Sequence, residues 1–223
     1  MGITNADQYG DHVTDSTREL PLFPLGVVHF PGQPLDLQVF EPRYLALLED
    51  LADQKAQEFG VVAITSGHEV GRDNLHAIAE AGCAVQIEHS RRVGGRVMLR
   101  AVGTWRFDHI QVLERNTPYL TAVVRPLPDE DTGQDDIAGL RSALFTYADA
   151  AELQLNTIPA DPHLFEWWVA AGGPFTQAER VQVLAASRAD RVERLTAWLR
   201  REAALLQGTG SIPFDRDPRQ SLN

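Results

Sequence analysis

The sequence is nearly without cysteine and lysine, because Cys83 and Lys55 are the only residues of these types among 223. A single cysteine cannot form a disulfide within the chain, and without a CxxC pair it does not belong to a common zinc motif. Apolar residues flank Cys83, so we expect a buried structural thiol. Lys55 is the one lysine available for a Ser–Lys dyad, and the exposed helix end expected there fits that role poorly.

Recognised catalytic motifs are missing as well. The chain has no GxxxxGK(S/T) phosphate loop, no HExxH pair and no GxSxG elbow. Without a phosphate loop it is not an ordinary ring ATPase motor. We therefore expect a protein that is not an enzyme and that has no cofactor and no metal. A small-molecule enzyme or ligand-binding protein, whose site residues meet only in the fold, stays open as an alternative.

Long apolar runs and a positive balance of charge are also absent. No segment approaches the roughly 18 consecutive apolar residues of a membrane span, and the N-terminus has no basic-then-apolar signal. The formal net charge is −11, whereas phosphate contacts need a clustered basic surface. The composition therefore predicts a cytoplasmic protein with no membrane and no nucleic-acid partner. The oligomeric state stays open.

Residues 19–127 have the pattern of short strands. FGVVAIT and YLTAVVRPL are apolar runs bounded by turn residues, and Val93-Gly94-Gly95 predicts a hairpin turn. In TWRFDHIQVLER the bulky positions change face, so we expect a β-bulge near His109. This half of the chain should be rich in strands.

Prolines interrupt the first of these strands. A central strand should exclude proline, which cannot donate to a ladder. We interpret Phe30-Pro31-Gly32 as a type II turn, Pro24 as a break between two apolar runs, and Pro42 as the first turn of a helix from Arg43 to about Asp53. Glu41 suits the dipole of that helix, and Arg43 could tie it to the strands. Short strands at bends with one helix indicate a partly closed barrel.

After residue 136 the apolar period becomes helical. Helix starts are predicted at Asp161-Pro162, at Thr176 with Glu179, and at Ser187 with Asp190. We expect the last helix to end before Gly208 and to turn four apolar residues inward: Val192, Leu195, Leu199 and Leu206. Adjacent Trp167 and Trp168 point in different directions on a helix, and we expect them to serve core or interdomain packing.

The predicted fold class is α+β, with a β pseudo-barrel that carries one helix and a helical bundle after it. The expected parts are a loose tail, the strand-rich part, an acidic linker, the helical part and a second tail: 1–18, 19–127, 128–136, 137–207 and 208–223.

One loop offers a candidate metal site. His68, Glu69, Asp73 and His76 could together hold zinc or manganese, which imidazole and carboxylate ligands suit. The segment GHEVGRDN also has the composition of a turn, and we favour that interpretation.

Arginines gather around the predicted hairpin and could bind a carboxylate or a phosphate. Because acidic residues are in surplus elsewhere, we expect these arginines to lie instead along exposed strand faces: Arg91, Arg92, Arg96, Arg100 and Arg106.

Several of these segments together resemble a known family. LPLFPLGVVHFPGQPLDLQVFEPRYLALLEDL, FGVVAI, GCAVQIEHSRRVGGRVMLRAVGTWRFDHIQVLE and PYLTAVVRPL are similar to the N-terminal domain of Lon proteases. The late segment AERVQVLAASRADRVERLTAWLRREAALL is similar to its helical half. The chain most resembles the stand-alone bacterial members that lack the ATPase and peptidase domains. It differs at Gly94-Gly95-Arg96, where relatives often carry Asp-Gly-Arg.

This resemblance implies a PUA-like pseudo-barrel and a role in binding protein substrates. We expect a non-catalytic module that binds unfolded client proteins or peptides, with a separate protease as a candidate partner. The candidate binding surface is a cleft between the barrel and the bundle, or an apolar patch with Phe40, Arg43, Tyr44 and Trp105. RNA binding by analogy with PUA-like folds is a second alternative, which the acidic balance disfavours.

Overall fold

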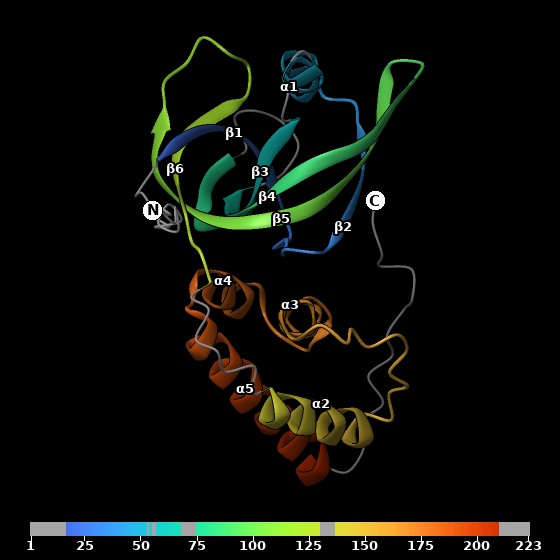
Figure 1. Cartoon of the computed structure of the whole chain (residues 1–223). Helices are drawn as coiled ribbons and strands as arrows, with labels where there is room; N and C mark the ends of the chain where they lie inside the picture. Colours follow the sequence, from blue (N-terminus) through green and yellow to red (C-terminus); the bar gives the residue numbers. More distant parts are fainter. Residues whose placement is uncertain (1–16, 53, 55–56, 68–74, 130–136, 210–223) are drawn as a thin grey trace, which may run out of the picture.

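Strands come first along the chain and most helices follow (Figure 1). The computed structural model describes residues 17–52, 54, 57–67, 75–129 and 137–209. The strands are β1 Arg18–Leu25, β2 Pro34–Val39, β3 Glu58–Gly67, β4 Leu75–Val93, β5 Arg96–Leu113 and β6 Leu120–Pro126. The helices are α1 Pro42–Ala52, α2 Ala138–Ala150, α3 Pro162–Gly172, α4 Gln177–Ala185 and α5 Arg188–Thr209. The predicted α+β class is confirmed.

The strands form one mixed sheet that returns on itself. Their order is β2-β5-β4-β3-β1-β6, and β5 pairs additionally with β6. Five strands therefore make a closed circuit, and β2 lies outside it, paired with β5. Figure 1 places α1 at one end of the sheet and the other four helices beyond the opposite end. The PUA-like relationship, the helical bundle and the exact domain bounds stay predictions.

Two prolines lie inside β1, which corrects our expectation that Pro24 breaks the run. β6 pairs with Arg18–Leu22, and β3 pairs with Leu22–Leu25. Pro21 and Pro24 therefore each occupy a stretch where β1 has a strand neighbour on one side only. A missing N–H costs no ladder hydrogen bond when it faces the side without a partner.

Three local predictions in the strands are confirmed. Gly32 and Gly94 have φ of 75° and 60°, as the two predicted turns require, and Gln33 N–H donates to Phe30 O at 3.2 Å. The β5–β6 register shifts between His109 and Gln111, which is the expected bulge. The two segments on either side of Gly103 join into one long β5.

The helix starts follow the sequence signals. Asp161 accepts from Leu164 N–H at 2.9 Å with a proline in the first turn, and Thr176 with Glu179 forms a capping box. The end of α5 was predicted wrongly, because the helix continues through Gly208 to Thr209. A glycine inside a helix costs only about 1 kcal/mol, which one terminal position can tolerate.

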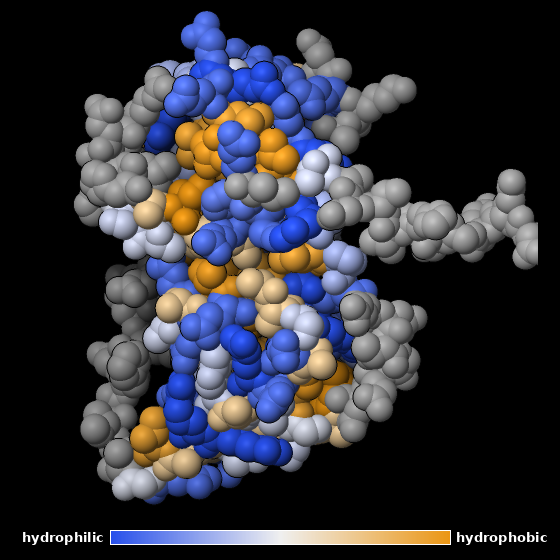
Figure 2. Space-filling view, turned by 90° about the vertical axis from the view of Figure 1, so that its left-hand side faces the viewer, coloured by the Kyte–Doolittle hydropathy of each residue, from blue (hydrophilic) through white to orange (hydrophobic). Residues whose placement is uncertain are grey.

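One of the clusters of buried apolar residues joins the helices to the sheet. Val28 and Phe30 from the β1–β2 connection pack with α2 to α5, and the Phe30 ring stacks on Trp167 at 5.7 Å. Trp168 packs against the same cluster, so the expected core role of both tryptophans is confirmed. On the face in Figure 2, polar side chains divide the exposed apolar surface into patches in both halves. Within the described ranges, none of the helices has the length and apolar character needed to cross a membrane.

The prediction for Cys83 is confirmed. Its thiol is fully buried, and burial raises its pKa well above the ordinary value. Gly103 on the neighbouring strand has room for no side chain, since an added Cβ would lie 2.1 Å from Phe30 O. This close approach places the β1–β2 connection directly on β5.

Arg106 corrects the prediction of exposed arginines. It is 5% exposed, and it donates to Leu184 O at 2.9 Å, to Ala186 O at 2.6 Å and to Asp129 Oδ1 at 2.7 Å. Burial lowers its pKa from the usual value, and Asp129 opposes that shift. The start of the predicted linker is therefore anchored to both halves of the molecule.

The anchor continues into α3 and α5. Arg191 is fully buried and contacts Asp129 Oδ2 at 2.9 Å and Glu166 Oε2 at 3.0 Å. Arg188 Nε donates to Glu166 Oε1 at 2.8 Å, and the Arg191 guanidinium lies 3.8 Å from the Trp167 ring centre. Ion pairs and apolar packing together thus hold the helices on the sheet.

Because His29 is buried, we expect the folded protein to lose stability in mild acid. Its Nε2 lies 3.0 Å from Gln33 O, and desolvation lowers its pKa from 6.5 to about 4. The unfolded chain takes up this proton near pH 6.5, whereas the folded chain does so only near 4. The neutral imidazole therefore contributes its full stability, about 3 kcal/mol, above the pKa of the unfolded chain. This contribution is lost as the pH falls toward the pKa of the folded protein.

Urea unfolding at neutral pH and at a pH of about 4, of wild type and His29→Gln, measures this difference. Carboxylates titrate in both proteins and cancel in the comparison. Wild type should lose about 3 kcal/mol more than the variant. An equal loss in both would contradict the account of His29.

Candidate functional site

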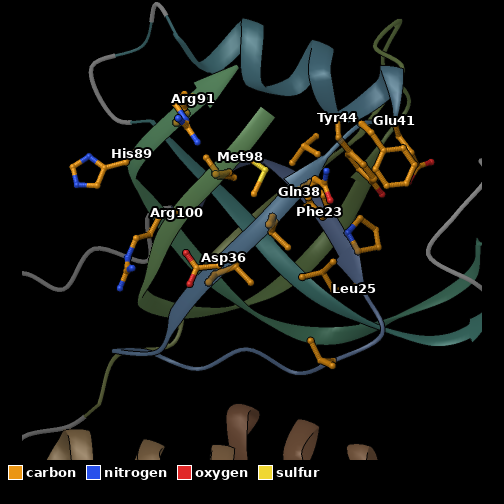
Figure 3. Close-up of a pocket in the computed structure, with 18 residues that line it drawn as sticks. Phe23, Leu25, Asp36, Gln38, Glu41, Tyr44, His89, Arg91, Met98 and Arg100 are labelled. Carbon is orange, nitrogen blue, oxygen red and sulfur yellow. The ribbon is translucent and has the colours of Figure 1, made fainter. Parts of the chain in front are cut away.

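A groove of about 1140 Å³ opens beside β2 (Figure 3). One wall is β1 with the start of α1, and the other is the hairpin of β4 and β5. Five consecutive residues of β2, from Leu35 to Val39, line it. Since successive side chains of a strand point to opposite faces, the groove follows the edge of β2 and reaches both of its faces.

The floor of the groove is apolar and well packed. Its buried members come from four elements: Phe23, Leu25, Leu35, Val39, Tyr44 and Leu99. Phe23 and Tyr44 stack with ring centres 3.9 Å apart and planes 17° apart. Stacked rings in a packed cluster hold a fixed shape, so the floor is formed before any ligand arrives.

The rim of the groove exposes large apolar side chains. Val27 is 49% exposed, Phe40 52% and Met98 43%. Single exposed apolar residues are common on protein surfaces, whereas several around one apolar hollow indicate a binding surface.

Two of the predicted site residues, Phe40 and Tyr44, line this groove together. Arg43 does not line it but is adjacent, because it pairs with Glu41 at 3.0 Å and lies 4.5 Å from the Tyr44 ring centre. The helix has other ties to the strand-rich part: Tyr119 Oη donates to Asp50 at 2.6 Å, and burial together with Asp50 raises the Tyr119 pKa to about 12.

Trp105 lies away from the groove, in the cluster around Phe107. Its Nε1–H donates to Glu58 Oε1 at 2.5 Å, and the Arg18 guanidinium covers the ring at 3.9 Å. The structure therefore does not bring Trp105 together with Phe40 and Tyr44. The sequence does not point to Met98 or to the residues of β2 as candidates, although Leu35, Leu37 and Val39 alternate with polar residues as in a strand.

The hairpin side of the groove is positively charged. Residues 91–100 contain four arginines and no acidic residue, although the chain as a whole is acidic. Arg91 and Arg100 line the groove with His89, and Figure 3 shows all three on the hairpin side of β2. Arg100 is 3.5 Å from Glu88, and its side chain is 54% exposed.

No metal centre is found in the part of the chain that the structure describes, where no three His, Cys, Asp or Glu side chains gather suitably. The side chains of the candidate loop, His68, Glu69, Asp73 and His76, lie outside the described residues. The metal hypothesis for that loop is therefore untested, and our preference for a turn stays a prediction.

Comparison with known proteins decides the family. Residues 19–201 match the model of the ATP-dependent protease La (LON) substrate-binding domain. The chain belongs to the Lon substrate-binding domain family. The resemblance found in the sequence is thereby confirmed, and the groove of this Lon-family domain is an apolar hollow beside β2.

Solved structures of Lon N-terminal domains share the fold. A crystal structure of a Lon N-terminal domain protein from Xanthomonas campestris is 28% identical in sequence and has a TM-score of 0.60. The match covers 81% of this chain and 98% of the Xanthomonas chain. The N-terminal domain of a Mycobacterium avium complex Lon protease is 14% identical, with coverage of 82% and 98% and a TM-score of 0.61. The second likeness shows the fold alone.

Proposed function

We propose that this Lon-family domain binds extended segments of unfolded proteins in the groove beside β2. The observation that carries the proposal is an apolar floor surrounded by exposed Val27, Phe40 and Met98. Membership of a substrate-binding family supports a protein ligand. Removing an apolar surface of this kind from water lowers the free energy by about 25 cal/mol per Å².

The size and openness of the groove favour a chain segment over a small molecule. Its volume of about 1140 Å³ exceeds the roughly 300–1,000 Å³ of typical small-molecule pockets. The groove follows β2 lengthwise, and a strand of six residues spans about 20 Å. A peptide in extended conformation has this shape.

The finer proposals follow from the family. We propose a cytoplasmic adaptor that holds client proteins for a separate protease and is not itself a catalyst. We also propose that the closed strand circuit is PUA-like and that α2 to α5 act as one helical bundle. Phe40 and Tyr44, with Arg43 beside them, belong to the proposed binding surface, whereas no observation supports a binding role for Trp105.

Phe40→Asp should weaken binding of a permanently unfolded protein by at least about tenfold, the effect of losing roughly 1.4 kcal/mol of apolar contact. Fluorescence anisotropy with a labelled, reduced and alkylated client measures the dissociation constant. Phe145→Asp is the matched control, because Phe145 is 49% exposed on α2 and Phe40 is 52% exposed.

Both variants should keep the melting temperature of the wild type, since both side chains are exposed. Equal binding by wild type and Phe40→Asp would remove the groove from the proposed function. Absence of binding by the wild type, at a client concentration in the high micromolar range, would overturn the function itself.

A further inference from the structure

The free edges around the groove suggest how a ligand is held. β2 pairs with β5 on one side, and no strand of the described residues pairs with its other side. In an antiparallel pair, every second residue directs its N–H and C=O away from the partner. β2 thus presents a row of backbone donors and acceptors along the groove, which is a template for another strand.

The facing wall has a free edge as well. β6 leaves β1 at Leu22, and β3 continues along Leu22–Leu25. Phe23, Pro24 and Leu25 therefore have no strand neighbour opposite β3 among the described residues, and all three line the groove. The groove lies between two strand edges of the same sheet, as the close-up of Figure 3 shows for β1 and β2.

Charge distinguishes one side of this groove from the other. Arg91 has no ion pair within the described residues, and Arg100 is half-exposed beside Glu88. Arg96 lies 6.0 Å from the Phe40 ring centre, which adds a further positive charge near the rim. Glu41, on the α1 side of the groove in Figure 3, is paired with Arg43 at 3.0 Å. The hairpin side is therefore complementary to an acidic ligand.

We propose that a client segment with apolar residues at alternate positions and acidic residues at one end adds as a strand to the free edge of β2. Its apolar side chains enter the groove, and its acidic end meets Arg91 and Arg100. Main-chain hydrogen bonds would then supply affinity that tolerates many sequences, and the groove with its basic side would supply the preference. This inference rests on the proposed function, because it names the class of segment that the same groove takes.

The first test uses a labelled peptide in which valine alternates with threonine and aspartates stand at one end. Two matched peptides carry N-methyl groups on one or the other alternate set of backbone amides. In an added strand only one set donates to β2, and each lost hydrogen bond weakens binding by roughly 2- to 10-fold. We expect one methylated peptide to bind at least tenfold more weakly and the other to bind like the parent peptide.

The second test exchanges charges. The variant Arg91→Glu with Arg100→Glu should bind the acidic peptide at least tenfold more weakly and should gain affinity for a peptide with arginines in place of the aspartates. Arg200→Glu, an exposed reversal on α5, is the control and should leave both affinities unchanged. A purely structural effect of the two substitutions would not reverse the preference.

The outcomes separate the two proposals. Peptides that bind equally well whatever their methylation and end charge would overturn strand addition and leave the groove as a general apolar binder. If neither these peptides nor the unfolded client bind, the proposed function fails together with this inference. Hydrogen exchange gives an independent measure, since alternate amides of β2 should become protected when the acidic peptide binds and should stay unprotected if it lies elsewhere.

Discussion

Replacing Glu166 with alanine is expected to lower the free energy of unfolding by about 3–5 kcal/mol. Glu166 is fully buried on α3 and accepts hydrogen bonds from Arg188 at 2.8 Å and from Arg191 at 3.0 Å. Without its carboxylate, both buried guanidinium groups lose their partner on α3, and Asp129 is the nearest remaining acid in the network. The cost comes from buried positive charge that is then compensated only in part. Equilibrium unfolding in urea measures it.

An exposed ion pair provides the control. Arg201 contacts Glu179 at 2.9 Å and Glu202 at 2.7 Å, and its side chain is 46% exposed. Arg201→Ala should therefore cost at most about 1 kcal/mol. A similar small cost for Glu166→Ala would show that the buried network does not hold the helices to the sheet as we describe.

Leu195→Ala should destabilise the protein by about 2–5 kcal/mol. Leu195 is fully buried on α5, in the cluster that joins the helices to the sheet. Truncation removes apolar contacts and leaves a cavity that packed neighbours fill only in part. Leu205→Ala on the same helix is the matched control, since Leu205 is 54% exposed and should change stability by less than about 0.5 kcal/mol. Equal effects of both substitutions, measured by urea unfolding, would contradict the assigned inward face of α5.

Local signals in the sequence predicted the local structure well. A helix cap such as Thr176 with Glu179 depends on residues three apart, and the turn at Gly94 depends on one backbone angle. Interactions of this range are visible in any single sequence. The prolines in β1 show the limit, because Pro24 fits the strand only where β6 no longer pairs with it.

Long-range burial could not be predicted in this way. No local pattern marks Arg106 as buried, because its partners Leu184 and Ala186 are about 80 residues away along the chain. The candidate site was likewise found only in part. Phe40 and Tyr44 are close in sequence, whereas Met98 joins them only because β5 pairs with β2.

The groove and the rigid core beneath it have separate roles in this account. Ion pairs and apolar packing fix the helices on one end of the sheet, while β2 keeps one edge without a strand partner within the described residues. An edge of this kind is a risk for aggregation unless it is used or protected. Binding of extended segments gives it a use.

An NMR titration of the isotope-labelled protein with a permanently unfolded client tests the central claim most directly. If extended segments bind in the groove, the shifted amides should cluster in β2, in Phe23–Leu25 and in the hairpin of β4 and β5. The amides of α2 and α5 should stay unchanged. Shifts confined to the helices, or no shifts while the client remains in excess, would contradict the account.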